Sequence, residues 1–194
     1  MTGPEPGRSE KQRMVAGELY LSADPELVAE RLRARQLVRE YNATAPEETA
    51  WRAALLAGLF GRLGAPVEIE PPFHCDYGYN IAAGLGLYMN VGCVVLDCAA
   101  VTIGSNVLCG PYVQIYTAYH PLDPEVRRQG RELARPAVIG DDVWLGGGVI
   151  VCPGVSIGEG TTIAAGSVVT RDIPSRVLAA GNPCRVLRPI EAKG

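Results

Sequence analysis

The chain has 194 residues, a length typical of one domain, and 47% of them are hydrophobic while 20% are charged. This composition is typical of a folded globular chain and excludes intrinsic disorder. The formal net charge of −3 gives no support to a nucleic-acid-binding role. Residues 98–122 carry no formal charge, but Asn106, Pro111 and Gln114 interrupt them, so we expect no membrane span.

Cysteine usage indicates the redox environment. The chain contains Cys75, Cys93, Cys98, Cys109, Cys152 and Cys184, with no C-x-x-C pair among them. The first 13 residues are polar and lack the apolar run of a secretory signal. We therefore expect reduced, mostly buried thiols in a cytoplasmic protein rather than a disulfide framework.

Two helices are predicted after a polar tail at residues 1–14, within an N-terminal helical segment at residues 15–64. Asp24 followed by Pro25 is typical of an N-cap and first helical position, so the first helix is expected from Pro25 to Tyr41. Thr44 and Glu47 have the spacing of a capping box for a second helix. An apolar stripe of the second helix recurs every four residues, at Trp51, Leu55, Leu59 and Leu63. This helix is expected to end at Gly64.

A six-residue repeat dominates the second half. Every sixth residue from 139 to 169 is aliphatic, and the fourth residue after each is small or β-branched. The repeat positions are Ile139, Leu145, Val151, Ile157, Ile163 and Val169. A weaker frame with one phase slip appears upstream, at Ile81, Leu87 and Cys93 and then at Ile103, Cys109 and Ile115. A period of six fits neither a helix nor a flat strand, but it fits a parallel β-helix with one short strand and one turn per hexad.

One charged segment interrupts this repeat. No hexad occurs in residues 120–136, and the frame resumes at Ile139, which is 24 residues, or four hexads, after Ile115. A loop extruded from a regular solenoid is usually functional. We therefore expect a β-helix domain at residues 73–185 that carries loop 120–136, followed by a C-terminal tail at residues 186–194.

The chain resembles the maltose and galactoside O-acetyltransferase branch of the hexapeptide-repeat acyltransferases, over about residues 14–190. The residues that carry the resemblance are Ala16–Tyr20, Arg31–Arg35, Cys75–Asn80, Tyr116–Pro121, Val143–Gly146 and Ala180–Pro183. The resemblance implies a left-handed parallel β-helix that forms homotrimers with active sites between protomers. It also implies acetyl transfer from acetyl-CoA to a sugar hydroxyl.

His120 is the predicted catalytic base. Attack of a hydroxyl on a thioester needs a group that removes the hydroxyl proton, and an imidazole titrates in the right range. His120 opens the extruded loop, and the resemblance places the family's base at this position. The alternative is a surface histidine that caps a turn. The only other histidine, His74, is expected to be an ordinary surface residue.

Five residues are predicted to bind the acceptor. Asn90 and Asp97 each occupy a position where the hexad pattern prefers a small or apolar residue, and Asp97 stands in an aliphatic position six residues before Ile103. Local turn stabilisation is the alternative for Asn90. The resemblance adds Asp76 and Arg31 as contacts to sugar hydroxyls, and Trp144 as a wall of the acceptor pocket or a packing residue.

Six residues are predicted to bind acetyl-CoA, with no metal. Small residues at Gly147 and Ala165 would let an extended pantetheine arm run along the coil, although corner packing would also explain them. The resemblance implies nucleotide contacts from Thr170, Arg171, Arg185 and Arg188, since guanidinium groups suit phosphates. A solvated basic tail is the alternative for the arginines.

The predicted function is acetyl-CoA-dependent O-acetylation of a sugar, at the 6-hydroxyl of maltose, glucose or a related glycoside. Alternatives on the same fold are an antibiotic or lipo-oligosaccharide acceptor, and a non-catalytic scaffold. A zinc-dependent hydratase would need about three histidines around the metal, and this chain has two. One family position also differs, because Ser22 stands where an acidic residue contacts sugar in this branch, with Asp24 displaced.

Overall fold

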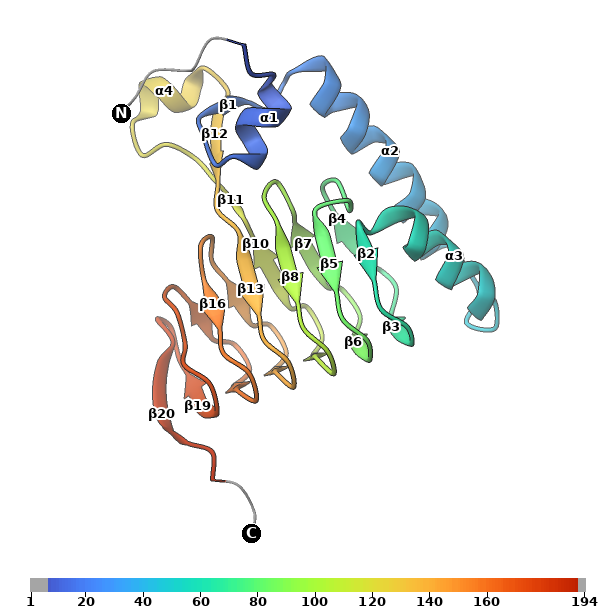
Figure 1. Cartoon of the computed structure of the whole chain (residues 1–194), viewed down its shortest axis with the longest axis vertical. Helices are drawn as coiled ribbons and strands as arrows, with labels where there is room; N and C mark the ends of the chain where they lie inside the picture. Colours follow the sequence, from blue (N-terminus) through green and yellow to red (C-terminus); the bar gives the residue numbers. More distant parts are fainter. Residues whose placement is uncertain (1–6, 192–194) are drawn as a thin grey trace.

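A computed structural model describes residues 7–191, and its main body is the expected left-handed parallel β-helix with three faces (Figure 1). Face one consists of β2 (Arg62–Leu63), β5 (Ile81–Ala83), β8 (Val101–Ile103), β13 (Ala137–Ile139) and β16 (Ser156–Ile157). Face two consists of β3 (Val67–Ile69), β6 (Leu87–Met89), β9 (Leu108–Cys109), β14 (Trp144–Leu145), β17 (Thr162–Ile163), β19 (Val177–Ala180) and β20 (Arg185–Pro189). Face three consists of β4 (His74–Cys75), β7 (Val94–Leu96), β10 (Gln114–Tyr116), β15 (Ile150–Val151) and β18 (Val168–Val169).

The hexad positions form the core of this prism. All six repeat residues from Ile139 to Val169 are at most 1% exposed, and so are the six upstream frame positions. Neighbouring coils pair in parallel through their strands, so side chains of one type stack along each face. Burial of one aliphatic side chain contributes about 1.5–3 kcal/mol. The six-residue repeat therefore provides both the geometry of the coil and most of its apolar core.

The phase slip comes from longer coils near the N-terminal end. Val138 pairs with Ser156, which lies 18 residues further along the chain, whereas Ile81 pairs with Val101, which lies 20 residues further. Ala83, and not Ile81, is consequently the residue beside Ile103. The two additional residues lie in the turn that follows β7. The expectation that Asp97 fills an aliphatic position of the repeat is therefore wrong, because Asp97 belongs to this enlarged turn.

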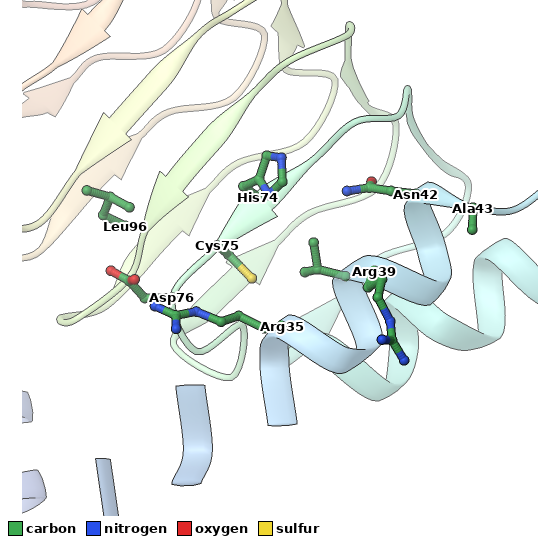
Figure 2. A pocket seen from close by; sticks show the side chains of 9 residues that line it. Arg35, Arg39, Asn42, Ala43, His74, Cys75, Asp76 and Leu96 are labelled. Carbon is green, nitrogen blue, oxygen red and sulfur yellow. The ribbon is translucent and has the colours of Figure 1, made fainter. Parts of the chain in front are cut away.

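The N-terminal segment packs against the start of the coil. Helix α2 (Pro25–Asn42) begins as expected, with the Asp24 side chain accepting a hydrogen bond from the Glu26 N–H. Helix α2 lies along β4 on face three (Figure 2). The coil itself already starts at β2 and β3, which pair with β5 and β6, before the expected boundary at residue 73.

The second helix, α3 (Thr49–Leu59), differs from its sequence prediction. The Thr44 capping box does not form, because the Thr44 hydroxyl donates to the Tyr41 carbonyl at the end of α2. The helix begins at Thr49 without a side-chain cap and ends at Leu59 rather than at Gly64. Trp51 is 48% exposed, because the buried face is made by Leu55, Leu56 and Leu59.

Both predicted tails contain ordered structure. Residues 10–15 form α1 (Glu10–Val15), which Ser9 caps and Met14 anchors in the core. At the other end, β20 pairs antiparallel with β19 on face two. Residues 1–6 and 192–194 of these tails lie outside the described part of the chain.

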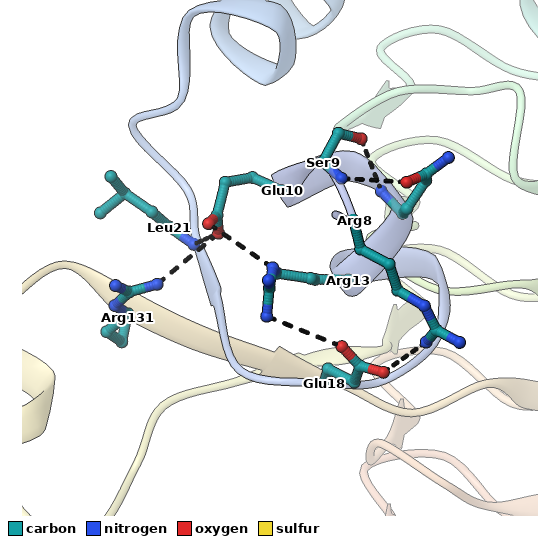
Figure 3. A network of polar contacts seen from close by, with 8 residues as sticks. Arg8, Ser9, Glu10, Arg13, Glu18, Leu21 and Arg131 are labelled. Carbon is teal, nitrogen blue, oxygen red and sulfur yellow. Dashed lines mark hydrogen bonds and ion pairs between the residues drawn. The ribbon is translucent and has the colours of Figure 1, made fainter. Parts of the chain in front are cut away.

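The extruded loop is folded back onto the N-terminal segment. Strand β11 (Ala118–Tyr119) precedes it, and it carries α4 (Pro124–Arg128) and β12 (Arg131–Ala134). Strand β12 pairs with both β11 and β1 (Tyr20–Leu21). The Glu10 carboxylate accepts a hydrogen bond from the Leu21 N–H and forms an ion pair with Arg131 at 3.6 Å (Figure 3). The segment that begins at His120 is therefore held by the N-terminal helical region, and the two parts fold together.

Some corner glycines lie directly against the backbone of the next coil, which yields a stability prediction. A Cβ atom on Gly146 would lie 2.5 Å from the backbone N of Ala165 in the next coil. We expect Gly146→Ala to lower the free energy of unfolding by about 1–3 kcal/mol, because the coils must separate to admit the methyl group. Gly58→Ala is the matched control, since Gly58 lies in α3 with nothing within 4 Å of its Cβ position. Urea unfolding at equal protein concentration should show the control unchanged or stabilised, and equal losses in both variants would contradict the packing argument.

Candidate active site

The predicted site residues lie on two corners of the prism. The corner between faces three and one carries Asp76 after β4, Asp97 after β7 and His120 beyond β10, with Thr170 and Arg171 after β18. The corner between faces two and three carries Asn90 after β6, Gly147 after β14 and Ala165 after β17. Face three thus separates His120, Asp76 and Asp97 from Asn90, Gly147 and Ala165.

Asp97 organises the first of these corners. Its carboxylate is fully buried and accepts hydrogen bonds from the N–H groups of Asp76 at 3.1 Å, Tyr77 at 2.8 Å and Asn80 at 3.3 Å. Burial raises the pKa of Asp97 to about 6, and the N–H donor of Tyr77 opposes that rise. In this protomer Asp97 therefore shapes the turn of residues 76–80, so its geometry shows a positioning role for the neighbouring side chains.

Asp76 is the carboxylate that this turn presents. Its Oδ2 atom accepts a hydrogen bond from the Cys98 thiol at 3.5 Å. Burial raises the pKa of Asp76, and the nearby Arg31 guanidinium opposes the rise. Burial also raises the pKa of Cys98 well above its usual range, so the thiol stays neutral and acts as a donor. The other Asp76 oxygen accepts no hydrogen bond from residues 7–191.

Arg31 links this turn to the N-terminal segment. Its guanidinium donates to the Tyr77 hydroxyl at 2.6 Å and to the Ser22 carbonyl at 2.7 Å. Ser22 stands at the position where the resemblance implies an acidic residue. Its carbonyl accepts a hydrogen bond from Arg31, which is itself predicted to contact the sugar. The Arg31 charge acts on the Asp76 carboxylate, but both hydrogen bonds of its guanidinium go to groups of the protein.

His120 stands at the end of β11 with its side chain exposed. Within residues 7–191 the imidazole makes no hydrogen bond or ion pair. The strand before it is anchored by the buried Thr117, whose hydroxyl donates to the Leu96 carbonyl at 2.6 Å and accepts from the Ala99 N–H at 2.9 Å. A histidine on a fixed strand without a protein partner is available to a bound hydroxyl.

Sequence reasoning missed several residues around this corner. Tyr20 donates a hydrogen bond from its hydroxyl to Glu132 at 2.8 Å and packs with Tyr77 and Cys98 in a small apolar cluster. Burial raises the pKa of Tyr20 above its ordinary value, so its hydroxyl keeps its proton. Tyr20 and Tyr77 both belong to motifs that carry the family resemblance, and that signal was present in the sequence.

Asn90 begins the second corner, and one end of its side-chain amide is bonded while the other is free. Its Oδ1 atom accepts from the Val91 N–H at 2.8 Å, which is the local turn role weighed from the sequence. Its amide nitrogen makes no hydrogen bond within residues 7–191 and is free to donate. Asn90 therefore stabilises its turn and presents a donor at the same time.

Below Asn90 the same corner is lined by backbone. A Cβ atom on Gly147 would lie 3.4 Å from the Cδ and O atoms of Pro111, and Ala165 is exposed one coil further. The Gly147 carbonyl accepts from the Gly166 N–H at 2.9 Å, which keeps the stack in register. An extended chain can approach this edge closely because no bulky side chain covers it.

The remaining predicted residues lie around this arrangement. Arg185 and Arg188 are exposed on β20, at the C-terminal end of face two. Thr170 and Arg171 are exposed on the opposite corner from Gly147. Trp144 is 54% exposed on the outer side of face two, between Leu108 and Thr162 of the adjacent strands. Trp144 therefore does not line a pocket with Asp76 of the same chain.

Comparison with known proteins identifies this arrangement. Residues 13–64 match the maltose acetyltransferase hexapeptide capping motif, and residues 136–171 match the bacterial transferase hexapeptide repeats. The structure of a maltose O-acetyltransferase from Clostridium difficile 630 superposes with a TM-score of 0.94 at 46% identity, covering 95% of this chain and 99% of that one. The chain belongs to the maltose and galactoside O-acetyltransferase branch of the hexapeptide-repeat acyltransferases.

Two further relatives span nearly the same length. A galactoside acetyltransferase solved in complex with coenzyme A superposes with a TM-score of 0.90 at 40% identity, covering 95% of this chain and 92% of that one. Nodulation protein L of Rhizobium meliloti is 51% identical over 92% of this chain and 98% of its own. The expectations of the family and of an acetyltransferase enzyme are confirmed.

The described residues contain neither a membrane-spanning helix nor a metal-binding cluster. No helix between residues 7 and 191 is long and apolar enough to cross a membrane. In the same range, no three His, Cys, Asp or Glu side chains are grouped as a metal site would require. All six cysteines are free thiols, and five of them are buried.

Proposed function

We propose that this enzyme transfers an acetyl group from acetyl-CoA to a sugar hydroxyl, the 6-hydroxyl of maltose, glucose or a related glycoside. The observation that carries the proposal is the unpartnered His120 imidazole on the corner where Asp97 fixes Asp76. His120 removes the hydroxyl proton while the hydroxyl oxygen bonds to the acetyl carbon. The carbon–sulfur bond then breaks, and the proton passes to the leaving thiolate, so no metal and no covalent enzyme intermediate are needed.

The small-residue corner fits acetyl-CoA. Gly147 and Ala165 leave a narrow exposed edge along which a pantetheine arm can lie, and complexes of relatives with coenzyme A or acetyl-CoA support this assignment. Arg185 and Arg188 supply guanidinium groups at the end of that edge for the phosphates. On the far corner, Thr170 and Arg171 are proposed to contact the same cofactor from a second protomer.

The acceptor is proposed to bind at the corner of Asp76. A carboxylate with one free oxygen is a good acceptor for sugar hydroxyls, and the free amide of Asn90 supplies a donor from an adjacent protomer, because Asn90 lies on the other corner of its own chain. Asp97 and Arg31 hold the surrounding turns, and Trp144 would join the pocket only from another protomer. The names of the maltose and galactoside relatives support a sugar of this kind. The six free thiols fit a reducing, cytoplasmic compartment.

We propose a homotrimer whose active sites lie between protomers. Six residues separate Asn90 from Leu96 across face three, a distance of about 15–20 Å at the rise of a strand. A thioester bound along the corner of Gly147 therefore does not reach His120 of the same protomer. In a closed threefold assembly, the corner of Gly147 in one protomer can face the corner of His120 in the next.

Shared sites predict complementation between two impaired variants. His120→Ala and Asn90→Ala damage opposite corners, so a mixed trimer contains some sites in which both corners are intact. We expect co-refolded variants to regain activity in up to about one quarter of the sites, as random assembly of a cyclic trimer requires. The measurement is release of free thiol from acetyl-CoA in the presence of maltose.

The control for this experiment is each variant refolded alone, which should stay at its own low activity. Light scattering should give the mass of a trimer for every sample. No recovery on mixing, or full activity in a dilute monomer, would contradict the shared site while leaving the family assignment intact.

A further inference from the structure

A groove lies between α2 and face three, beside the proposed acceptor corner. Its volume is about 590 Å³, and Val38, Cys75 and Leu96 give it an apolar floor. The polar side chains along it are Arg35, Arg39, Asn42, His74 and Asp76, as Figure 2 shows (Figure 2). We call this feature the basic groove. Its volume falls within the range of sites that bind small ligands.

The charge of the basic groove is positive, in a chain whose net charge is −3. Arg35 and Arg39 make no hydrogen bond and no ion pair within 4.0 Å among residues 7–191. The carboxylate at this site is that of Asp76, toward which the Arg35 side chain extends. Two guanidinium groups beside one carboxylate leave an excess positive charge, and guanidinium groups bind phosphates and carboxylates through paired N–H donors.

Helix periodicity connects the basic groove to the acceptor residues. Arg31, Arg35 and Arg39 are spaced four residues apart on α2, so they lie along one side of the helix. Arg31 holds Tyr77 in the turn that presents Asp76, whereas the next two arginines line the groove. Asn42 does not compete with a ligand for them, because both ends of its amide are bonded to the Phe73 backbone.

The basic groove also reaches the strand that carries the base. Leu96, at one end of the groove, pairs with Tyr116 in the next coil, and the Thr117 N–H donates to the Leu96 carbonyl at 3.0 Å. His120 follows three residues later. An acceptor whose reactive hydroxyl lies at His120 and whose ring contacts Asp76 therefore has its other end directed toward Arg35 and Arg39.

We propose that the acceptor is an anionic saccharide, with a phosphate or carboxylate group that binds Arg35 and Arg39 in the basic groove. This inference rests on the proposed sugar O-acetyltransferase function and specifies its substrate class. The apolar floor of Val38 and Leu96 packs against a sugar ring, and the His74 imidazole adds a further polar contact. Arg35 and Arg39 are both exposed, but a solvated helix face would not explain why they share a groove with an apolar floor and with the Asp76 carboxylate.

The test compares acceptors that share a non-reducing glucose unit and differ in the charge at the other end. Maltose 1-phosphate and maltobionate carry a phosphate and a carboxylate, and methyl maltoside is their neutral counterpart. We expect kcat/KM for at least one anionic acceptor to exceed that for methyl maltoside by about tenfold at low salt, a difference of about 1.4 kcal/mol. The preference should fall toward one in 0.5 M NaCl, since exposed charges are screened.

Variants assign the preference to the groove. In Arg35→Gln/Arg39→Gln, the ratio of anionic to neutral kcat/KM should fall to about one. Arg62→Gln is the matched control, because Arg62 is exposed on face one with no hydrogen bond or ion pair among residues 7–191, and it should keep the full ratio. Equal kcat/KM for charged and neutral acceptors in the native enzyme, or an unchanged ratio in the double variant, would overturn the proposal.

Equilibrium binding separates this proposal from the proposed function. If neither methyl maltoside nor the anionic acceptors release thiol, the sugar acetylation assignment fails on that observation. Calorimetric titration of maltose 1-phosphate then decides the groove directly: we expect Kd to rise about tenfold in the double variant but not in Arg62→Gln. Absence of binding, or equal binding to all three proteins, would overturn the anionic assignment.

Discussion

His120→Ala should lower kcat by about 10²–10⁴-fold, the contribution typical of a positioned general base. The imidazole is exposed on a strand that Thr117 anchors, and it has no protein partner among residues 7–191, so its removal leaves the surrounding fold intact. Acetyl-CoA binding should change little, because the proposed cofactor edge lies on the other corner. Steady-state kinetics with acetyl-CoA and maltose, with a separate titration of acetyl-CoA, measure the two quantities.

A second variant in the same loop controls for disturbance of the fold. Gln129 is exposed at the end of α4 and its side chain has no role in the site, so Gln129→Ala should retain near-native turnover and thermal stability. Near-native kcat in His120→Ala would place the base elsewhere. An equal loss in both variants would show that the loop, and not the imidazole, is what the reaction needs.

The coil was predictable because its sequence signal is periodic. Each hexad repeats the same requirement, an aliphatic side chain inside and a small residue at the turn, so six copies reinforce one another from Ile139 to Val169. The N-terminal end was read less well. Thr44 and Glu47 have the spacing of a capping box, but the Thr44 hydroxyl donates to the Tyr41 carbonyl instead. Tertiary packing then sets the start of α3.

Asp97 shows why single positions in the site are harder to predict. The hexad frame placed it in an aliphatic position, where a carboxylate would be costly. The structure instead places it in a turn with two additional residues, and three backbone N–H groups of the turn at residues 76–80 in the preceding coil compensate its burial. A frame derived from spacing does not reveal where an insertion falls within a coil, so the partners of Asp97 could not be anticipated.

The hexad pattern alone did not predict which site residues lie together. Asn90 and His120 are both polar exceptions at hexad turns, yet they lie at opposite ends of face-three strands. The order of the three faces within each coil, rather than the distance along the sequence, decides which turns share a corner. Residues 76, 97 and 120 therefore belong together, and residues 90, 147 and 165 form the second group.

Sugar acceptors should release thiol from acetyl-CoA, and removal of one hydroxyl should abolish that release. We expect maltose and glucose to be better acceptors than galactosides, because the Cys75–Asn80 turn resembles that of the maltose-acting subgroup and Asp76 offers a free carboxylate oxygen to a sugar with several hydroxyls. 6-Deoxyglucose keeps the ring contacts but lacks the proposed nucleophile. It should give no measurable acetylation and should compete weakly with glucose.

Thiol release, with mass spectrometry of the products, measures acetylation, and inhibition by 6-deoxyglucose measures binding. The two readouts separate recognition from chemistry, since a competitor that is not acetylated must occupy the site without presenting a nucleophile to His120. Acetylation of 6-deoxyglucose as fast as glucose would show that a ring hydroxyl, not the 6-hydroxyl, is the target. Thiol release with a hydroxylated antibiotic and with none of the sugars would replace the acceptor class, because Asp76 and Asn90 would then serve a different ring system on the same acetyl-transfer site.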